Sequence, residues 1–187
     1  MNVLLKYNIF MARIGFTGTL SVGKTTLVNA LKELPEFKDY YFSTERSKYL
    51  RDLGIPLNTD STVKGQMVFA AERASELIRE NLITDRTIID VMAFTKLAKS
   101  IPYFINEDFT KMYSHLIPEY DYIFYVLPDG VDIEDNGVRT TDSKYRDEIN
   151  KEIEKLTIVY RNKMKHFAKL SGSTENRIAE IKRVIGL

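Results

Sequence analysis

The residues best suited to chemistry form a stretch near the N-terminus, residues 18–25, which read GTLSVGKT. They fit the spacing G-x-x-x-x-G-K-[ST], in which backbone amides cradle phosphates, the lysine reaches the β- and γ-phosphates, and the last hydroxyl holds Mg²⁺. A short strand pattern precedes the stretch, and apolar residues at helical spacing follow it. The stretch therefore predicts nucleotide binding rather than a glycine turn that only joins a strand to a helix. We assign the phosphate contacts to Gly18, Ser21, Gly23, Lys24, Thr25 and Thr26, with Lys24 also a catalytic residue.

Two carboxylates follow predicted strands, at the points where those strands end. Asp85 ends a short apolar run, and Glu45 comes directly after an aromatic one. Ligands of parallel α/β sheets bind at the carboxyl ends of the strands, and phosphoryl transfer needs a carboxylate for Mg²⁺ and a group that orients the acceptor hydroxyl. We expect Asp85 to hold Mg²⁺ with Thr25, directly or through water, and Glu45 to act as general base. The alternatives are that Asp85 caps a helix at Thr87 and that Glu45 only complements a helix dipole.

Four arginines are candidates for contacts with phosphates or with the second substrate. Arg86 follows the predicted magnesium carboxylate and is expected to bridge phosphates, whereas Arg46 contacts the acceptor or pairs with an acid. Arg139 and Arg146 lie in the segment 128–147, which we interpret as a lid that brings arginines to developing phosphoryl charge. The alternative for that segment is an exposed loop with ordinary surface charges.

Three residues of one predicted helix, Gln66, Phe69 and Arg73, share a helix face because they stand at positions i, i+3 and i+7. An amide beside an aromatic ring is a plausible reader of a nucleobase, so we expect this trio to contact the acceptor. The alternative is that the trio only packs, with a solvated arginine.

Composition limits the classes of protein that the chain can represent. The sequence has 187 residues, a formal net charge of +1 and no cysteine, which excludes a disulfide framework and a thiolate zinc site and gives no global case for nucleic-acid binding. His115 and His166 are interpreted as structural, and Mg²⁺ is the metal that the residues suggest. Residues 1–11 are read as a dispensable extension or an extra strand, too short to span a membrane and without a signal-peptide cleavage pattern. We therefore expect a cytoplasmic protein, and a homo-oligomer is possible.

Strand and helix patterns alternate along the whole chain, which predicts one α/β domain, residues 1–187, with about five parallel strands and helices on both faces. Strands are expected over 12–17, 40–44, 82–85, 121–127 and 167–170. Helices are expected over 24–31, 45–53, 87–99 and 107–116, from Asp60 or Ser61 to about Glu80, along a stripe from Ile149 to Phe167, and after residue 173.

In this order the motifs resemble those of the NadR-like small P-loop ATPase/kinase group of bacteria and phages. The matching residues are 18–26, Thr44 to Arg46, Pro56 to Asn58 before the Gln66 helix, Thr84 to Thr87 with Asp90, Asp129-Gly130, Gly137 to Arg139, Tyr145-Arg146, and Ser171 to Ser173 with Arg177. The resemblance implies a three-layer P-loop kinase fold with an arginine-bearing lid. It also implies that Gly172 and Arg177 flank the adenine of ATP.

A weaker similarity links the chain to deoxynucleoside kinases, in which a glutamate after strand two is the base and a helical glutamine reads the nucleobase. Glu45 and Gln66 stand in the analogous order, and Asp85-Arg86-Thr87 replaces an acid-Arg-Ser motif. The sequence thus predicts an ATP- and Mg²⁺-dependent kinase with a nucleoside- or nucleotide-type acceptor.

Two other functions stay open at this stage. One is a kinase for a hydroxyl of DNA, at a 5′ end or on a modified base, against which the near-neutral charge argues because polymer binding relies on several phosphate contacts. The other is a nucleotide-dependent switch, although the chain lacks the base-reading sequence Asn-Lys-x-Asp of G proteins.

Overall fold

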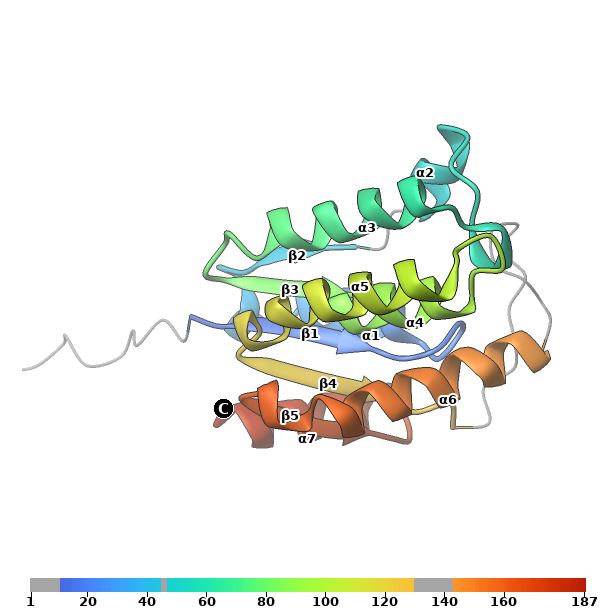
Figure 1. Ribbon diagram of the computed structural model, residues 1–187. Coiled ribbons are helices and arrows are strands. Elements are labelled where there is room, and N and C mark those ends of the chain that lie inside the picture. The colour runs from blue at the N-terminus through green and yellow to red at the C-terminus, as the bar shows by residue number, and fades with distance from the viewer. Residues whose placement is uncertain (1–10, 45–46, 130–142) are drawn as a thin grey trace, which may run out of the picture.

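A computed structural model describes residues 11–44, 47–129 and 143–187 of the chain. Within these residues five parallel strands form one sheet in the order β2-β3-β1-β4-β5 (Figure 1). The strands are β1 (Arg13–Thr17), β2 (Tyr41–Ser43), β3 (Leu82–Asp85), β4 (Tyr122–Val126) and β5 (His166–Leu170). The helices are α1 (Lys24–Lys32), α2 (Ser47–Asp52), α3 (Val63–Glu76), α4 (Ile88–Leu97), α5 (Tyr103–Tyr113), α6 (Ser143–Val159) and α7 (Thr174–Ile185). The predicted five-stranded parallel α/β sheet is therefore confirmed.

Helices cover both faces of the sheet and produce two separate apolar cores. Helices α1 and α7 pack on one face, where Phe16 and Phe124 are fully buried, and α3, α4, α5 and α6 pack on the other, around Ile123. Because both faces are covered, the central strands read as continuous apolar runs, as in other parallel sheets. All carboxyl ends of the strands lie at one edge of the molecule, on the side of α2 and the first turn of α6 (Figure 1).

Helix α3 is shorter than the predicted helix from Asp60 or Ser61 to Glu80. It begins at Val63, and its cap is Thr62, whose hydroxyl accepts a hydrogen bond from the Gly65 amide at 3.2 Å. Residues 58–60 form a separate 3-10 turn, because Asn58 has a left-handed backbone with a φ of 57° that ends any continuous helix.

The sequence pattern predicted a single helix along the apolar stripe from Ile149 to Phe167, and this prediction is wrong. Helix α6 ends at Val159, a 3-10 turn follows over Arg161–Lys163, and Phe167 belongs to β5. The pattern recorded burial rather than helicity, since Met164 lies outside the helix and is still only 5% exposed. The predicted helix 107–116 likewise begins earlier, as α5, and continues into the 3-10 segment Ser114–Glu119.

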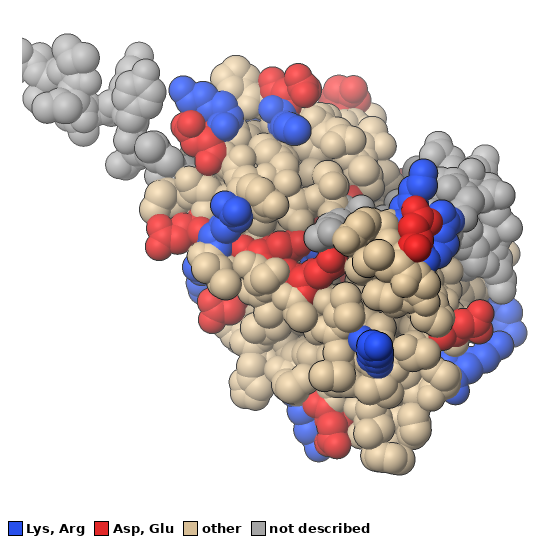
Figure 2. Space-filling view, turned by 90° about the horizontal axis from the view of Figure 1, so that it is seen from above, with Lys and Arg blue, Asp and Glu red and all other residues tan. Residues whose placement is uncertain are grey.

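The surface is mixed in charge. On the face seen in Figure 2, acidic and basic side chains are scattered over a larger uncharged area, and basic side chains form no continuous band among the described residues there. No helix in the described part of the chain is both long and apolar enough to cross a membrane. The predicted extension, residues 1–11, falls almost wholly outside the described residues.

The two-sided packing makes a prediction about α7. Ile181 is fully buried between α7 and the sheet, whereas Ile158 on α6 is 72% exposed. We expect Ile181→Ala to lower the free energy of unfolding by about 2–5 kcal/mol through lost burial and an unfilled cavity. Ile158→Ala should stay within about 0.5 kcal/mol of the parent. Urea unfolding measures both, and equal losses would contradict the packing described.

Candidate active site

The loop of residues 18–25 joins β1 to α1, as the motif predicts, and two of its glycines are required by its geometry. Gly18 has a φ of 155°, and a Cβ there would lie 2.7 Å from the carbonyl oxygen of Val126. Gly23 has a left-handed φ of 82° and precedes the first residue of α1. The N-terminal amides of α1 therefore open directly onto the loop, and a helix N-terminus favours anionic groups such as phosphates.

Lys24 is held inside this loop. Its Nζ donates to the carbonyl oxygens of Gly18 at 2.6 Å and Thr19 at 2.7 Å, and the residue is only 6% exposed. The ammonium is thereby fixed over the loop rather than extended into solvent. This is the position from which a lysine of this motif reaches β- and γ-phosphates.

Thr25 and Asp85 meet although sixty positions separate them in the chain. The Thr25 hydroxyl donates to Oδ2 of Asp85 at 2.5 Å, and Asp85 is almost fully buried. The contact follows from the parallel pairing of β1 with β3, which sets Phe16 opposite Asp85. The alternative interpretation, in which Asp85 caps the next helix, is wrong. The cap of that helix is Thr87, whose hydroxyl accepts a hydrogen bond from the Ile89 amide.

This pair suits Mg²⁺. In the described part of the chain no three acidic or histidine side chains gather into a metal-binding group. Mg²⁺ in phosphoryl-transfer sites needs only one or two protein ligands, because phosphate oxygens and waters complete its octahedron. A hydroxyl and a buried carboxylate in contact at the mouth of the loop are such ligands.

Asp90, which the sequence analysis quoted in a motif without giving it a role, links the loop to α4. Its Oδ1 accepts from the Gly18 amide at 3.3 Å, and its Oδ2 accepts from the Thr87 amide at 2.8 Å. The second bond closes a capping box, which the spacing of Thr87 and Asp90 could have revealed. The contact with Gly18 could not have been read from the sequence, since it joins elements far apart in the chain.

A pocket lies next to the loop, between α3 and α4. It contains Gln66 and Phe69 of the predicted acceptor trio, together with Arg86. Gln66 is buried, and its Oε1 lies 3.2 Å from the Thr95 hydroxyl. The other lining residues are Leu20, Ser47, Leu57, Asn58, Ser61, Asp90, Val91 and Phe94. Because Leu20 belongs to the loop itself, the cavity adjoins the place where a bound phosphate chain would end.

Arg86 points toward this cavity from an unusual backbone conformation. Its φ is 110°, a value that side-chain-bearing residues rarely adopt and that costs on the order of 1–3 kcal/mol. Its guanidinium carbon lies 5.1 Å from the ring centroid of Phe94, within the range of a cation–π contact.

Arg73 does not line the cavity with Gln66 and Phe69. It is 4% exposed, and its guanidinium forms an ion pair of 2.6 Å with Glu76. Burial raises the pKa of Glu76, while Arg73 and hydrogen bonds from Ser43 and Thr84 oppose that rise. Arg73 thus does not line the cavity with Gln66 and Phe69, and it is not the solvated arginine of the alternative interpretation. Glu76 was not identified from the sequence as part of the site, although its i+3 spacing from Arg73 indicates an ion pair on one helix face.

Arg146 braces the loop from the first turns of α6. Its Nε donates to the Leu20 carbonyl at 3.0 Å, and its own carbonyl accepts from the Thr19 hydroxyl at 2.8 Å. The structure therefore brings Arg146 to the loop, in contact with backbone atoms. Arg139, the rest of the predicted lid over 130–142, Glu45 and Arg46 lie outside the described residues.

Arg177, in the first turn of α7 (Thr174–Ile185), contacts the loop, and Gly172 lies in the preceding β5–α7 connection. Arg177 donates to the carbonyl oxygens of Val22 at 2.7 Å and Leu127 at 3.2 Å, and it pairs with Asp129 at 3.2 Å. Asp129 also accepts from the Gly172 amide. These residues therefore meet beside the loop, next to the first turn of α1.

The sheet order and the loop between β1 and α1 define a P-loop protein with a kinase-like α/β fold. A family model described as an AAA domain matches residues 13–177, so the chain belongs to this family of P-loop domains. No curated protein matches the sequence.

Solved structures with a similar fold include NadR in complex with NR, which has 16% sequence identity and a TM-score of 0.73. NadR in complex with NAD and AMP-PNP has 17% sequence identity and a TM-score of 0.71. Each match covers 95% of this chain but only 52% and 50% of the NadR chains, so this chain spans about half their length. Deoxyadenosine kinase from M. mycoides with the products dCMP and dCDP matches at 17% identity and a TM-score of 0.64, over 93% of this chain and 98% of that one. Identities this low establish a shared fold alone.

The contacts of Arg177 predict a structural role that its neighbour on α7, Arg183, lacks. Replacing Arg177 by Met removes the side-chain donor of the Val22 and Leu127 carbonyls and the cation that pairs with Asp129, which should cost about 1–3 kcal/mol of unfolding free energy. Arg183→Met removes only an exposed pair with Glu180 and should leave the midpoint of urea unfolding unchanged. Urea unfolding of the two variants tests this, and an unchanged Arg177→Met protein would refute the role.

Proposed function

We propose that the protein is an ATP- and Mg²⁺-dependent kinase that transfers the γ-phosphoryl group to a small nucleoside- or nucleotide-type acceptor. The observation that carries the proposal is the shared wall at Leu20, through which a P-loop and a partly apolar cavity adjoin. A phosphate donor in the loop and a second substrate in the cavity would then meet without moving either binding site. Since the donor is ATP, we place its action in the cytoplasm.

On the donor side, the loop amides and the N-terminus of α1 would bind the triphosphate. Lys24 would follow the transferred phosphoryl group, and Thr25 and Asp85 would hold Mg²⁺, which neutralises charge on the β- and γ-phosphate oxygens. Arg146 keeps the loop in shape through Leu20, and we retain Arg139 as a closing residue. Gly172 and Arg177 would lie beside the adenine.

On the acceptor side, the rings of Phe69 and Phe94 offer apolar surfaces for a planar base, and the amide of Gln66 offers a donor and an acceptor for its edge. Arg86 brings a positive charge to the same space, where the acceptor oxygen attacks. Glu45 is our proposed general base, and Arg46 an acceptor contact. In support, Ser47, two residues beyond Glu45, lines the cavity.

The mostly apolar lining of this cavity favours a small molecule over a DNA strand. A polymer needs a groove of basic side chains that follows its phosphates, whereas the described surface seen in Figure 2 intersperses basic with acidic side chains. The solved structures of similar fold are complexes with NR, NAD or deoxynucleotides. Those ligands suggest which acceptors to test first.

The proposal predicts a specific loss on removal of the loop lysine. Lys24→Ala should lower kcat by at least about 10²-fold, because the variant removes a charge aimed at the transferring phosphoryl group. Lys32→Ala, at the exposed end of the same helix, is the matched control and should keep the parent's rate. The measurement is transfer of labelled γ-phosphate to a panel of nucleosides, nucleotides, nicotinamide riboside and oligonucleotides.

Each arm of that assay decides between functions. Transfer to a small acceptor supports the proposal, whereas transfer to oligonucleotides alone would support a DNA kinase. Strong ATP binding with slow hydrolysis, unaltered by any acceptor, would replace the kinase by a nucleotide-dependent switch.

The role given to Asp85 predicts a changed metal requirement. Asp85→Asn removes the buried carboxylate that contacts Thr25, so the Mg²⁺ concentration for half-maximal transfer should rise by about tenfold or more. Asp108→Asn, at an exposed position of α5, should leave that concentration unchanged. A magnesium titration of initial rates measures both, and an unshifted curve for Asp85→Asn would remove it from the metal site.

A further inference from the structure

The side chain of Arg86 lines the cavity, but its backbone has an unfavourable positive φ. A buried polar network stabilises this backbone conformation. We propose that Thr84, Arg73 and Glu76 form a positioning device for Arg86, which fixes the direction of its guanidinium toward the acceptor. The inference rests on the proposed function, because it gives Arg86 a substrate to meet. Its three members do not touch the cavity and act only through Arg86.

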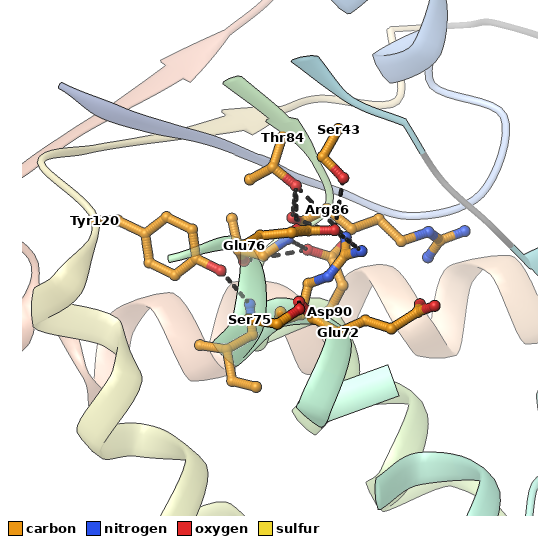
Figure 3. A network of polar contacts seen from close by, with 11 residues as sticks. Ser43, Glu72, Ser75, Glu76, Thr84, Arg86, Asp90 and Tyr120 are labelled. Atoms are coloured by element: carbon orange, nitrogen blue, oxygen red, sulfur yellow. Dashed lines mark hydrogen bonds and ion pairs between the residues drawn. The ribbon is translucent and has the colours of Figure 1, made fainter. Parts of the chain in front are cut away.

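The centre of the network is the carboxylate of Glu76. It accepts from the Ser43 hydroxyl at 2.5 Å, from an Arg73 nitrogen at 2.6 Å and from the Thr84 hydroxyl at 3.1 Å (Figure 3). These donors come from β2, α3 and β3, so one carboxylate joins the end of two strands to a helix. The Arg73 and Glu76 side chains are only 5% and 11% exposed, which shields their ion pair from water.

Both backbone groups of Arg86 are hydrogen-bonded, the amide to β1 and the carbonyl to the network. The Arg86 amide donates to the Phe16 carbonyl at 3.0 Å, as an extension of the β1–β3 pairing. The Arg86 carbonyl turns back and accepts from the Thr84 hydroxyl at 3.1 Å, with an Arg73 nitrogen at 3.5 Å. A carbonyl and an amide fixed in this way impose the φ of 110°. A rare backbone conformation persists where its surroundings determine it in several ways, and such residues cluster at functional sites.

The position of the guanidinium follows from this backbone. With φ positive, the side chain leaves β3 on the side of α4 and reaches the ring of Phe94 in the cavity wall. A relaxed backbone at Arg86 would send the side chain in another direction. The neighbours Asp85 and Thr87 have their own fixed partners, so a change in the network should act on Arg86 first.

Thr84 is the member that can be changed with the least disturbance. Its single hydroxyl proton is shared between the Glu76 carboxylate and the Arg86 carbonyl, and Thr84→Val removes the hydroxyl while keeping the shape. The ion pair between Arg73 and Glu76 remains. Thr84→Ser retains the hydroxyl, and Thr110→Val is the matched control, because that buried hydroxyl bonds only to a carbonyl of its own helix.

The kinetic test compares these variants with the parent on the best acceptor of the panel. Thr84→Val should lose about tenfold or more in kcat/KM for the acceptor, because a displaced positioning group costs rate steeply, while the KM for ATP stays within about twofold. Thr84→Ser and Thr110→Val should resemble the parent. Equal losses in Thr84→Val and Thr110→Val, or a loss confined to the KM for ATP, would overturn the inference.

A structural readout separates this inference from the proposed function. In a crystal structure of Thr84→Val we expect Arg86 to leave its positive φ and its guanidinium to move away from Phe94. An unchanged Arg86 would overturn the positioning role even if the parent is an active kinase. A relaxed Arg86 in a protein whose parent transfers no phosphate to any acceptor would support the network and refute the proposed function.

Discussion

The parallel pairing of β1 with β3 is the constraint on which the rest of the site depends. It sets Phe16 opposite Asp85, so that the P-loop leaving β1 and the Asp85 segment leaving β3 emerge side by side. The Thr25–Asp85 hydrogen bond and the Asp90 contact with Gly18 both follow from it. β3 joins β1 although β2 precedes it in the chain, a rearrangement typical of doubly wound sheets, whose ligands bind where the strand order reverses.

The two halves of the proposed site are joined by bonds that leave little freedom between them. Asp90, in the first turn of α4, lines the cavity and accepts a hydrogen bond from the Gly18 amide of the loop. Arg146 and Arg177 donate to loop carbonyls from α6 and α7. The hydrogen bonds of the Glu76 network stabilise the strained backbone conformation of Arg86. The fold thus fixes the relative positions of the P-loop and the cavity, which is the contribution that the proposed phosphoryl transfer would ask of the protein.

The sheet and the loop were predictable from the sequence, because buried strands read as apolar runs and the loop requires fixed residue types at fixed spacing. The position of Arg73 was not. Seven residues after Gln66 it lies on the same face of α3, as predicted, but at 1.5 Å per residue it lies about 10 Å further along the axis. It therefore contacts Glu76 and Thr84 instead of the cavity. Helical periodicity specifies a face and not a depth, and the contacts of Asp85 and Asp90 depend on strand order, which no local pattern records.

The most direct test of the central claim is a crystal structure of the protein with Mg²⁺, a non-hydrolysable ATP analogue and the acceptor preferred in solution. The account predicts the triphosphate in the loop at Lys24, and the acceptor between Phe69 and Phe94 with its hydroxyl directed at the γ-phosphate. An acceptor bound outside that cavity, or a nucleotide whose phosphates avoid the loop, would contradict it.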